Sequence, residues 1–140
     1  MMYLLDTNVV SELRKAHVGK ADRNVKAWAD GVLPSSLFLS AITLLELEMG
    51  TLLIERRDSR QGAILRAWLN QRVLPAFAGR ILAVDTAVAQ CCAKLHVPDP
   101  RADRDALIAA TALVHGMTVV TRNVEDFKPT GVALLNPWEK

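Results

Sequence analysis

The chain alternates short apolar runs with longer segments whose apolar residues recur at helical spacing. Each short run is almost continuously apolar, which is typical of a parallel strand covered on both faces and not of a strand with one face in water. The strands predicted in this way are Met1–Leu5, Leu37–Ser40, Ile81–Val84, Met117–Thr121 and Val132–Leu135.

Helices are predicted between these strands, where apolar residues return every three or four positions. Asp6 or Asn8 can cap the first helix and Asp85 or Thr86 a later one, while Gly116 ends the last long one. The predicted helices are Val9–Lys15, Val25–Gly31, Thr43–Arg57, Ala63–Phe77, Thr86–Leu95 and Asp103–His115. Strands that alternate with helices predict an α/β fold, a three-layer α/β/α sandwich with a short, mostly parallel sheet.

Composition narrows the class of protein. With 140 residues, of which 51% are hydrophobic, the chain is expected to form a single domain over residues 1–140. A net charge of +2 excludes a polybasic tail and an acidic solvating segment. The two cysteines, Cys91 and Cys92, are adjacent, so a disulfide scaffold is excluded and a reducing cytoplasm is expected.

Neither a leader nor a membrane span is expected. Asp6 interrupts the first apolar run too early for a signal peptide. The longest uncharged stretch, residues 106–121, falls short of the ~20 apolar residues that a span needs. The three histidines are not spaced as a metal-binding pair, which argues against a zinc site.

Acidic residues follow several of the predicted strands. Asp6 closes the first strand, Glu46 lies in the helix after the second, Asp105 lies in the first turn of a later helix, and Asp126 lies beyond the fourth strand. Ligands of open parallel sheets bind beyond the carboxyl ends of the strands. We therefore expect these four carboxylates to converge at one edge of the sheet.

Four carboxylates in one cleft repel each other unless a cation neutralises them. Oxygen ligands without histidine or cysteine select hard ions, here Mg²⁺ or Mn²⁺. Such an ion lowers the pKa of a bound water and offsets charge on a phosphorane. The acids therefore point to phosphodiester hydrolysis.

Each acid also has a purely structural interpretation. Asp6 can serve only as a helix cap, Glu46 as a solvated helix residue, and Asp105 as a first-turn carboxylate favoured by the helix dipole. Glu48 is expected to point away from Glu46 into solvent. Gly50 lies one turn after Glu46, and the close approach of another group is a plausible reason for a glycine inside a helix.

Four segments, in this order, resemble the PIN-domain ribonucleases, and more narrowly the VapC-type toxins of type II toxin–antitoxin systems in their FitB-like branch. The four segments are Leu4–Glu12, Ser40–Leu47, Asp105–Ala112 and Val119–Asn123. Residues Pro75–Leu82 and the ending Asn136–Trp138 also resemble that branch. The resemblance covers essentially the whole chain.

The resemblance implies a PIN-like sandwich whose acids bind Mg²⁺ or Mn²⁺ and cut single-stranded RNA. Asp6, Glu46 and Asp105 match the first three acids of the family and are the expected metal ligands. The fourth position is occupied by Asn123, which brings no charge, and Asp126 is the nearest substitute. The expected catalytic set is therefore Asp6, Glu46, Asp105 and Asp126, with one firmly held ion.

Polar neighbours of these acids are expected to support them. Thr7 and Asn8 are expected to orient Asp6, and Ser40 or Thr121 to hydrogen-bond a metal-bound water. Asn123 offers an amide oxygen, and Arg122, like Arg104, lies near enough for a phosphate contact. The supporting residues are thus Thr7, Asn8, Ser40, Thr121, Arg122 and Asn123.

The resemblance also implies partners. These are an RNA substrate, a second copy of the chain in a homodimer, and a cognate VapB-type antitoxin, with higher assembly in the antitoxin complex. Residues 51–80 hold six arginines against two acids, an excess that can track a phosphate backbone. A solvated helix face or a surface for an acidic partner explains the same arginines.

Two other functions fit parts of the pattern. The first is a non-catalytic RNA- or partner-binding module of the same fold, because Asn123 removes a charge from the site. The second is a phosphoacceptor receiver domain, which Asp6, Thr121 and the Lys128-Pro129 pair fit superficially. A receiver requires a second acid beside the first, and only 12 residues follow Lys128.

Overall fold

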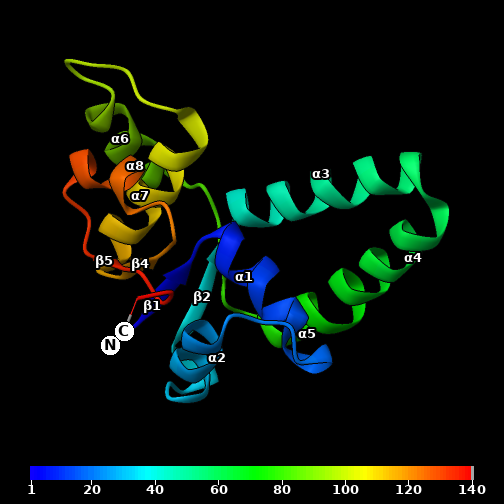
Figure 1. Ribbon diagram of the computed structural model, residues 1–140. Helices are drawn as coiled ribbons and strands as arrows, with labels where there is room; N and C mark the ends of the chain where they lie inside the picture. The colour runs from blue at the N-terminus through cyan, green and yellow to red at the C-terminus, as the bar shows by residue number, and fades with distance from the viewer. Residues whose placement is uncertain (140) are drawn as a thin grey trace.

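A computed structural model describes residues 1–139 and contains one parallel sheet (Figure 1). Its five strands lie in the order β3-β2-β1-β4-β5 within these residues. All neighbouring pairs are parallel. The strands are β1 (Tyr3–Leu5), β2 (Leu37–Ser40), β3 (Ile81–Leu82), β4 (Thr118–Val120) and β5 (Leu134–Leu135).

The strand order creates a switch point between β1 and β4. The chain adds β2 and β3 on one side of β1 and then crosses to add β4 and β5 on the other. Leu5 pairs with Val120 at the carboxyl ends of these two strands. A crevice outside such a switch point is where open α/β sheets bind ligands. The order differs from the 2-1-3-4-5 of flavodoxin-like sheets, which argues against the receiver alternative.

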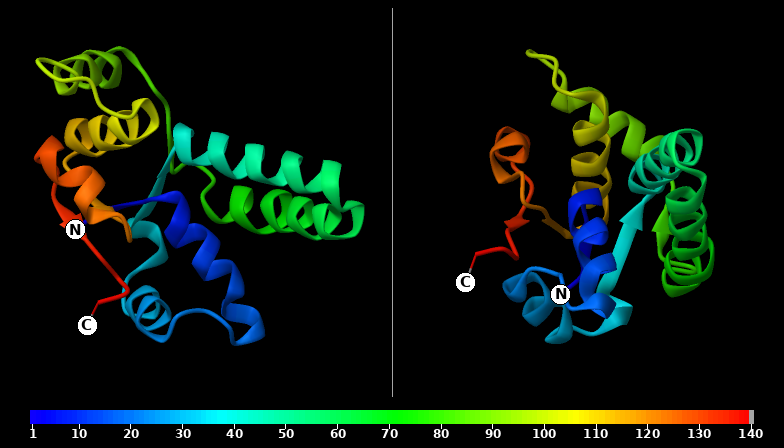
Figure 2. Two further views of the ribbon diagram at one scale, coloured as in Figure 1. Left: turned by 45° about the horizontal axis from the view of Figure 1, so that its top comes forward. Right: turned by 45° about the vertical axis from the view of Figure 1, so that its right-hand side comes forward.

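Helices cover both faces of the sheet, as the three-layer prediction required (Figures 1 and 2). Leu4 points to one face, where it packs with Ile108 and Phe127, and Leu5 points to the other, where it packs with Val9 and Leu69. The helices are α1 (Thr7–Leu13), α2 (Arg23–Asp30), α3 (Ala41–Arg57), α4 (Ser59–Trp68), α5 (Leu74–Ala76), α6 (Thr86–Leu95), α7 (Asp103–His115) and α8 (Val124–Phe127).

Local caps explain where several helices begin. The Ser40 hydroxyl accepts a hydrogen bond from the Ile42 amide and begins α3, and the Asp85 carboxylate does the same for α6 by accepting the amide of Val88. Asp58 accepts bonds from two amides of α4, which therefore begins at Ser59, four residues before the predicted start. Gly116 ends α7 in the left-handed conformation, as its position predicted.

The region 122–131, predicted only as rich in turns, contains the short helix α8 and a 3-10 turn over Lys128–Thr130. Phe127 is fully buried against the sheet and explains why this segment is ordered into a helix. The strands are one to two residues shorter at their ends than predicted, except β2. Within residues 1–139, no helix combines the length and the apolar character needed to cross a membrane.

Helices α3 and α4 form a hairpin that extends away from the sheet (Figures 1 and 2). Their close contact occurs at Gly62, where a Cβ atom would lie 2.5 Å from Cα of Glu55. The same test at Gly50 finds no atom within 4 Å. The expectation that Gly50 admits a close neighbour was therefore wrong, and Gly62 holds that role instead.

Candidate active site

Asp6 lies at the carboxyl end of β1, 6% exposed, and begins α1. One carboxylate oxygen, Oδ1, accepts a bond of 2.8 Å from the Thr7 amide, and the other, Oδ2, accepts one of 2.8 Å from the Thr121 hydroxyl. Both interpretations of Asp6 therefore apply, since it caps a helix and still faces the crevice. Burial raises its pKa, and repulsion from Glu46 and Asp126 adds to the rise.

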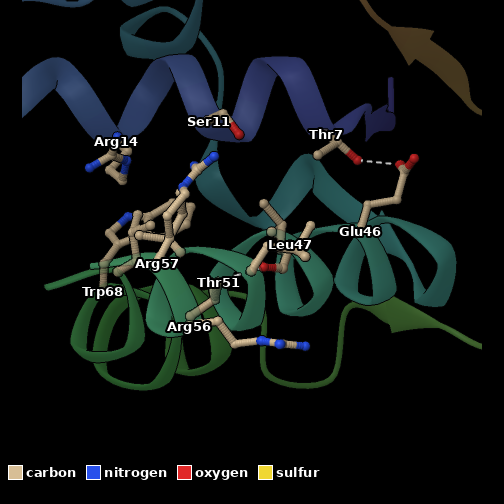
Figure 3. Close-up of a pocket in the computed structure, with 13 residues that line it drawn as sticks. Thr7, Ser11, Arg14, Glu46, Leu47, Thr51, Arg56, Arg57 and Trp68 are labelled. Carbon is tan, nitrogen blue, oxygen red and sulfur yellow. Dashed lines mark hydrogen bonds between the residues drawn. The ribbon is translucent and has the colours of Figure 1, made fainter. Parts of the chain in front are cut away.

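Thr7 joins Asp6 to the second acid. Its amide donates to Oδ1 of Asp6, the residue that caps α1, while its hydroxyl donates a bond of 2.6 Å to Oε1 of Glu46 on α3. Figure 3 shows this pair, with Thr7 and Glu46 pointing toward one another from α1 and α3. One residue thus fixes two carboxylates that lie far apart in the sequence.

Asn8 and Thr121 connect the ends of β1 and β4. The Asn8 side-chain amide lies 3.4 Å from both Oδ2 of Asp6 and the Thr121 hydroxyl, and its oxygen accepts a bond of 3.3 Å from the Arg122 amide. The Asn123 amide donates to the Thr121 hydroxyl at 3.0 Å. The same hydrogen-bond network therefore links the ends of β1 and β4 and orients Asp6.

Asp105, in the first turn of α7, completes the group with Asp126 on α8. Burial raises the pKa of Asp105, and repulsion from Asp6, Asp126 and Glu46 raises it further. Asp6 and Asp105 are thus each close enough to Glu46, to Asp126 and to one another for their charges to interact. The chain brings them together from the end of β1 and from α3, α7 and α8, at the edge where β1 and β4 end.

Arg104 brings a positive charge to these acids. Its Nη1 lies 3.6 Å from Oε2 of Glu46 and 3.9 Å from the Met49 sulfur, and its charge opposes the rise in the pKa of Asp105. Glu48 lies elsewhere, as predicted, but it is not a simple solvated residue. It forms an ion pair with Arg66 of α4, which also binds Glu55.

Comparison with known proteins decides the family. The PIN domain model matches residues 3–131 of the chain. The chain belongs to the PIN-domain family. It is 40% identical to the VapC ribonuclease Y4jK of Sinorhizobium fredii over 143 residues, which cover 99% of each chain. It is 40% identical to Toxin FitB of Neisseria gonorrhoeae, with 98% of this chain and 99% of that one covered.

Solved structures give the same assignment. The crystal structure of FitAcB from Neisseria gonorrhoeae matches with a TM-score of 0.89 at 38% identity, over 99% of this chain and 100% of that one. A toxin–antitoxin complex from Klebsiella pneumoniae matches with a TM-score of 0.67 at 25% identity, over 99% of both chains. The PIN-domain family and its VapC and FitB branch, inferred from the sequence motifs, are therefore confirmed.

Some of the predicted supporting residues of this PIN domain contact Asp6, and others do not. Thr7, Asn8 and Thr121 contact Asp6 directly, so the predicted orienting role of Thr7 and Asn8 agrees with the geometry. Ser40 is fully buried and its hydroxyl accepts the Ile42 amide, which makes it a helix cap. Asn123 is exposed and contributes its backbone amide to the network.

A groove of about 760 Å³ runs from Glu46, one of the four acids, along the PIN domain between α1 and the α3–α4 hairpin (Figure 3). Thr7 and Glu46 lie at one end, and Arg14, Arg57 and Trp68 lie at the other. Apolar side chains of the helices form part of its wall. The lining residues are Thr7, Ser11, Arg14, Glu46, Leu47, Gly50, Thr51, Leu53, Ile54, Arg56, Arg57, Leu65 and Trp68.

The arginines of residues 51–80 have separate roles, which sequence composition did not distinguish. Arg56 and Arg57 line the groove. Arg66 is held by Glu48 and Glu55, and Arg80 donates to the backbone carbonyls of Pro34, Leu37 and Ala76. Only part of the arginine excess is therefore available to a phosphate backbone in this groove.

Arg122 lies at the end of β4, and its guanidinium stacks 5.0 Å from the ring centre of Trp138. The Trp138 backbone is fixed by Asn24, which donates to its carbonyl at 2.7 Å, and by Asn136, which accepts its amide at 3.0 Å. No sequence pattern predicts this contact, because scattered tryptophans are typical of core positions. It directs the Arg122 side chain toward the C-terminal segment.

The donor set fits a hard divalent cation. Asp6, Glu46 and Asp105 offer only carboxylate oxygens, and their mutual repulsion is the situation that a bound cation relieves. Among residues 1–139, no three His, Cys, Asp or Glu side chains are already gathered as a ready-made metal cluster. Both carboxylate oxygens of Glu46 already have partners, because one accepts the Thr7 hydroxyl and the other faces the Arg104 guanidinium.

Proposed function

We propose that the protein is the toxin of a type II toxin–antitoxin system and acts as a Mg²⁺- or Mn²⁺-dependent endoribonuclease. The observation that carries this proposal is the convergence of Asp6, Glu46, Asp105 and Asp126 at the switch point of the sheet. The naming of a 40%-identical relative as a VapC ribonuclease supports the same reaction class.

Asp6, Glu46 and Asp105 are the residues that would hold the ion. When bound, the ion would supply a water of lowered pKa and would offset negative charge in the transition state. Asp126 is exposed and lies within electrostatic range of Asp6 and Asp105. We assign to its carboxylate the acceptance of a proton from the attacking water, since Asn123 brings no charge to the site.

The remaining polar residues keep this arrangement in place. The Thr121 hydroxyl and the Thr7 amide each occupy one oxygen of Asp6, so its carboxylate cannot rotate freely. The Thr7 hydroxyl holds Glu46 at a fixed distance from it. Because these bonds form within the protein before any substrate binds, Asp6 is already oriented at the moment of reaction.

The groove provides a path for an RNA strand. Its walls bring Arg14 and Arg57 to the side opposite Glu46, so phosphates that follow the reacting one can pair with guanidinium groups.

We also propose an antitoxin partner, a homodimeric assembly and a cytoplasmic location for this protein. A cognate VapB-type antitoxin and a homodimeric assembly are inferred from the family, and the matched toxin–antitoxin complex from Klebsiella pneumoniae supports the antitoxin. The exposed apolar residues Leu45, Leu52 and Leu53 of α3 offer surface for such contacts. Two free cysteines agree with action in the cytoplasm.

The test is cleavage of single-stranded RNA by the purified protein with added Mg²⁺ or Mn²⁺. Chelation by EDTA should abolish cleavage, and excess Mg²⁺ should restore it. Asp105→Asn should reduce the rate by about 10³-fold or more, because it removes one charge from the metal ligands. RNA binding without cleavage under every metal condition would instead support the non-catalytic module.

A further inference from the structure

Among residues 1–139, Arg104 is the basic residue that forms an ion pair with one of the four acids. It lies in the first turn of α7, next to Asp105, and reaches across to Glu46 on α3. Its guanidinium thus pairs with one proposed metal ligand, Glu46, and its charge also acts on a second, Asp105. Arg122 is directed to Trp138 instead, so the two arginines that sequence reasoning placed near the site are used differently.

Both carboxylate oxygens of Glu46 are engaged in this structure. Oε1 accepts the Thr7 hydroxyl at 2.6 Å, and Oε2 faces the Arg104 guanidinium at 3.6 Å. A hydroxyl can stay beside a carboxylate that also binds a cation, whereas a guanidinium competes with a cation for the same oxygen. Arg104 and a divalent ion are therefore alternative neighbours of Oε2.

The ion pair between Arg104 and Glu46 is weak enough for Arg104 to exchange Glu46 for another partner. The Arg104 side chain is 51% exposed, and the ion pair is longer than a direct hydrogen bond. The guanidinium also makes a weak contact with the Met49 sulfur at 3.9 Å. Few interactions therefore hold the guanidinium on Glu46 once another partner becomes available.

We propose that Arg104 is an exchangeable counterion, which neutralises the acids in the free protein and pairs with an RNA phosphate in the substrate complex. This inference rests on the proposed nuclease function and adds a residue to its substrate contacts. RNA brings negative charge to the place where the ion takes over Glu46, and the planar guanidinium binds phosphate through two parallel hydrogen bonds. The same residue then weakens ion binding without RNA and strengthens RNA binding with it.

Two effects of opposite sign follow from this exchange. In the absence of RNA, Arg104→Gln should tighten Mn²⁺ binding by about 2- to 5-fold, because an exposed ion pair of this strength is removed. In the same variant, kcat/KM for RNA should fall by about 10-fold or more, because a charge-assisted bond to phosphate is lost. Arg104→Lys should keep Mn²⁺ binding near the wild-type value and recover part of kcat/KM.

Mn²⁺ binding by isothermal titration, together with cleavage of a single-stranded RNA, measures both effects. Arg60→Gln is the matched control, since Arg60 is exposed on α4, outside the groove lining, and its loss removes the same charge. Circular dichroism melts confirm that each variant is folded. Tighter Mn²⁺ binding in Arg104→Gln and not in Arg60→Gln supports the exchange.

Unchanged or weaker Mn²⁺ binding in Arg104→Gln overturns the proposal, as does an equal change in Arg60→Gln. So does an unchanged kcat/KM. If the nuclease proposal itself is wrong, the result differs, because the wild-type protein would then neither bind Mn²⁺ nor cleave RNA. The two failures are therefore distinguished by the wild-type measurements.

Discussion

The two ends of the groove are constructed in different ways. At the acid end, where Thr7 and Glu46 line the groove, Thr7 donates hydrogen bonds to Glu46 and to the almost fully buried Asp6. At the other end, Arg57 is exposed, and Arg14 contacts the Trp68 ring at 5.8 Å. In the proposed nuclease, the comparison assigns the chemistry to the fixed geometry of the acid end and an adaptable contact with the RNA strand to the arginine end.

The largest effect is expected at the acid end. Glu46→Gln should reduce RNA cleavage by about 100-fold, because it removes the charge of one ligand while keeping its shape. Glu48→Gln, two positions further along the same helix, should leave kcat near the wild-type value. Its ion pair with Arg66 is a surface contact, so its stability cost should be about 1 kcal/mol or less.

Steady-state kinetics and thermal melts of the two variants check this contrast. Equal losses of activity in Glu46→Gln and Glu48→Gln would mean that the helix face assigned to the site is wrong. A loss of activity in Glu48→Gln alone would indicate that the active site lies nearer the contact between α3 and α4.

A smaller effect, on binding and not on the chemical step, is expected at the arginine end. Arg14→Gln and Arg57→Gln should each weaken RNA binding several-fold at ~0.1 M salt and reduce the salt slope by about 0.7 per lost phosphate contact. Fluorescence anisotropy with a labelled RNA, in an Asp105→Asn background, measures binding without cleavage. A fall in kcat with an unchanged KM would show that these arginines act on the chemistry, and the contrast between the ends would fail.

The smallest effect concerns stability. Burial and neighbouring acids raise the pKa of Asp6, so the folded state favours its protonated form and loses stability as the pH rises above the unfolded pKa of about 3.9. Asp6→Asn removes this cost and keeps a capping oxygen for the Thr7 amide, but it loses the oxygen that accepts the Thr121 hydroxyl, so the net rise in Tm at pH 7 should be small, about 2 °C or less.

The gain from Asp6→Asn should vanish at low pH, where the carboxyl group is protonated in both states. Thermal melts of both proteins between acidic and neutral pH, in EDTA, follow the difference. Added Mn²⁺ should stabilise the wild type and have little effect on the variant. A lower Tm for the variant at pH 7 would show that the ionised form of Asp6 is structurally required.

The framework and the four acids could be predicted from the sequence. Continuous apolar runs predicted the parallel strands, and an acid after a strand end lies at the carboxyl edge whatever the details of packing. Asp6 could therefore be placed at this edge from the local pattern, whereas Glu46 and Asp105, which lie on helices, were selected through the family resemblance. Helices α6 and α7 were predicted with their observed ends because Asp85 and Gly116 determine them locally.

Contacts between helices could not be predicted in the same way. The ion pair of Glu48 depends on the angle at which α4 returns along α3, which no local pattern encodes. The same packing explains why Gly62, and not Gly50, is the glycine that a neighbour approaches. Arg104 meets Glu46 only because α7 lies beside α3 once the sheet has formed.

The order of strands also bears on how the protein is made. Strand β1 is synthesised first, but one of its two neighbours in the sheet is β4, near the other end of the chain. Asp6 cannot receive its bond from Thr121, nor meet Asp105 and Asp126, until nearly the whole chain has left the ribosome. A nascent chain therefore lacks the complete set of acids, so the ribosome that makes it is not exposed to an assembled site.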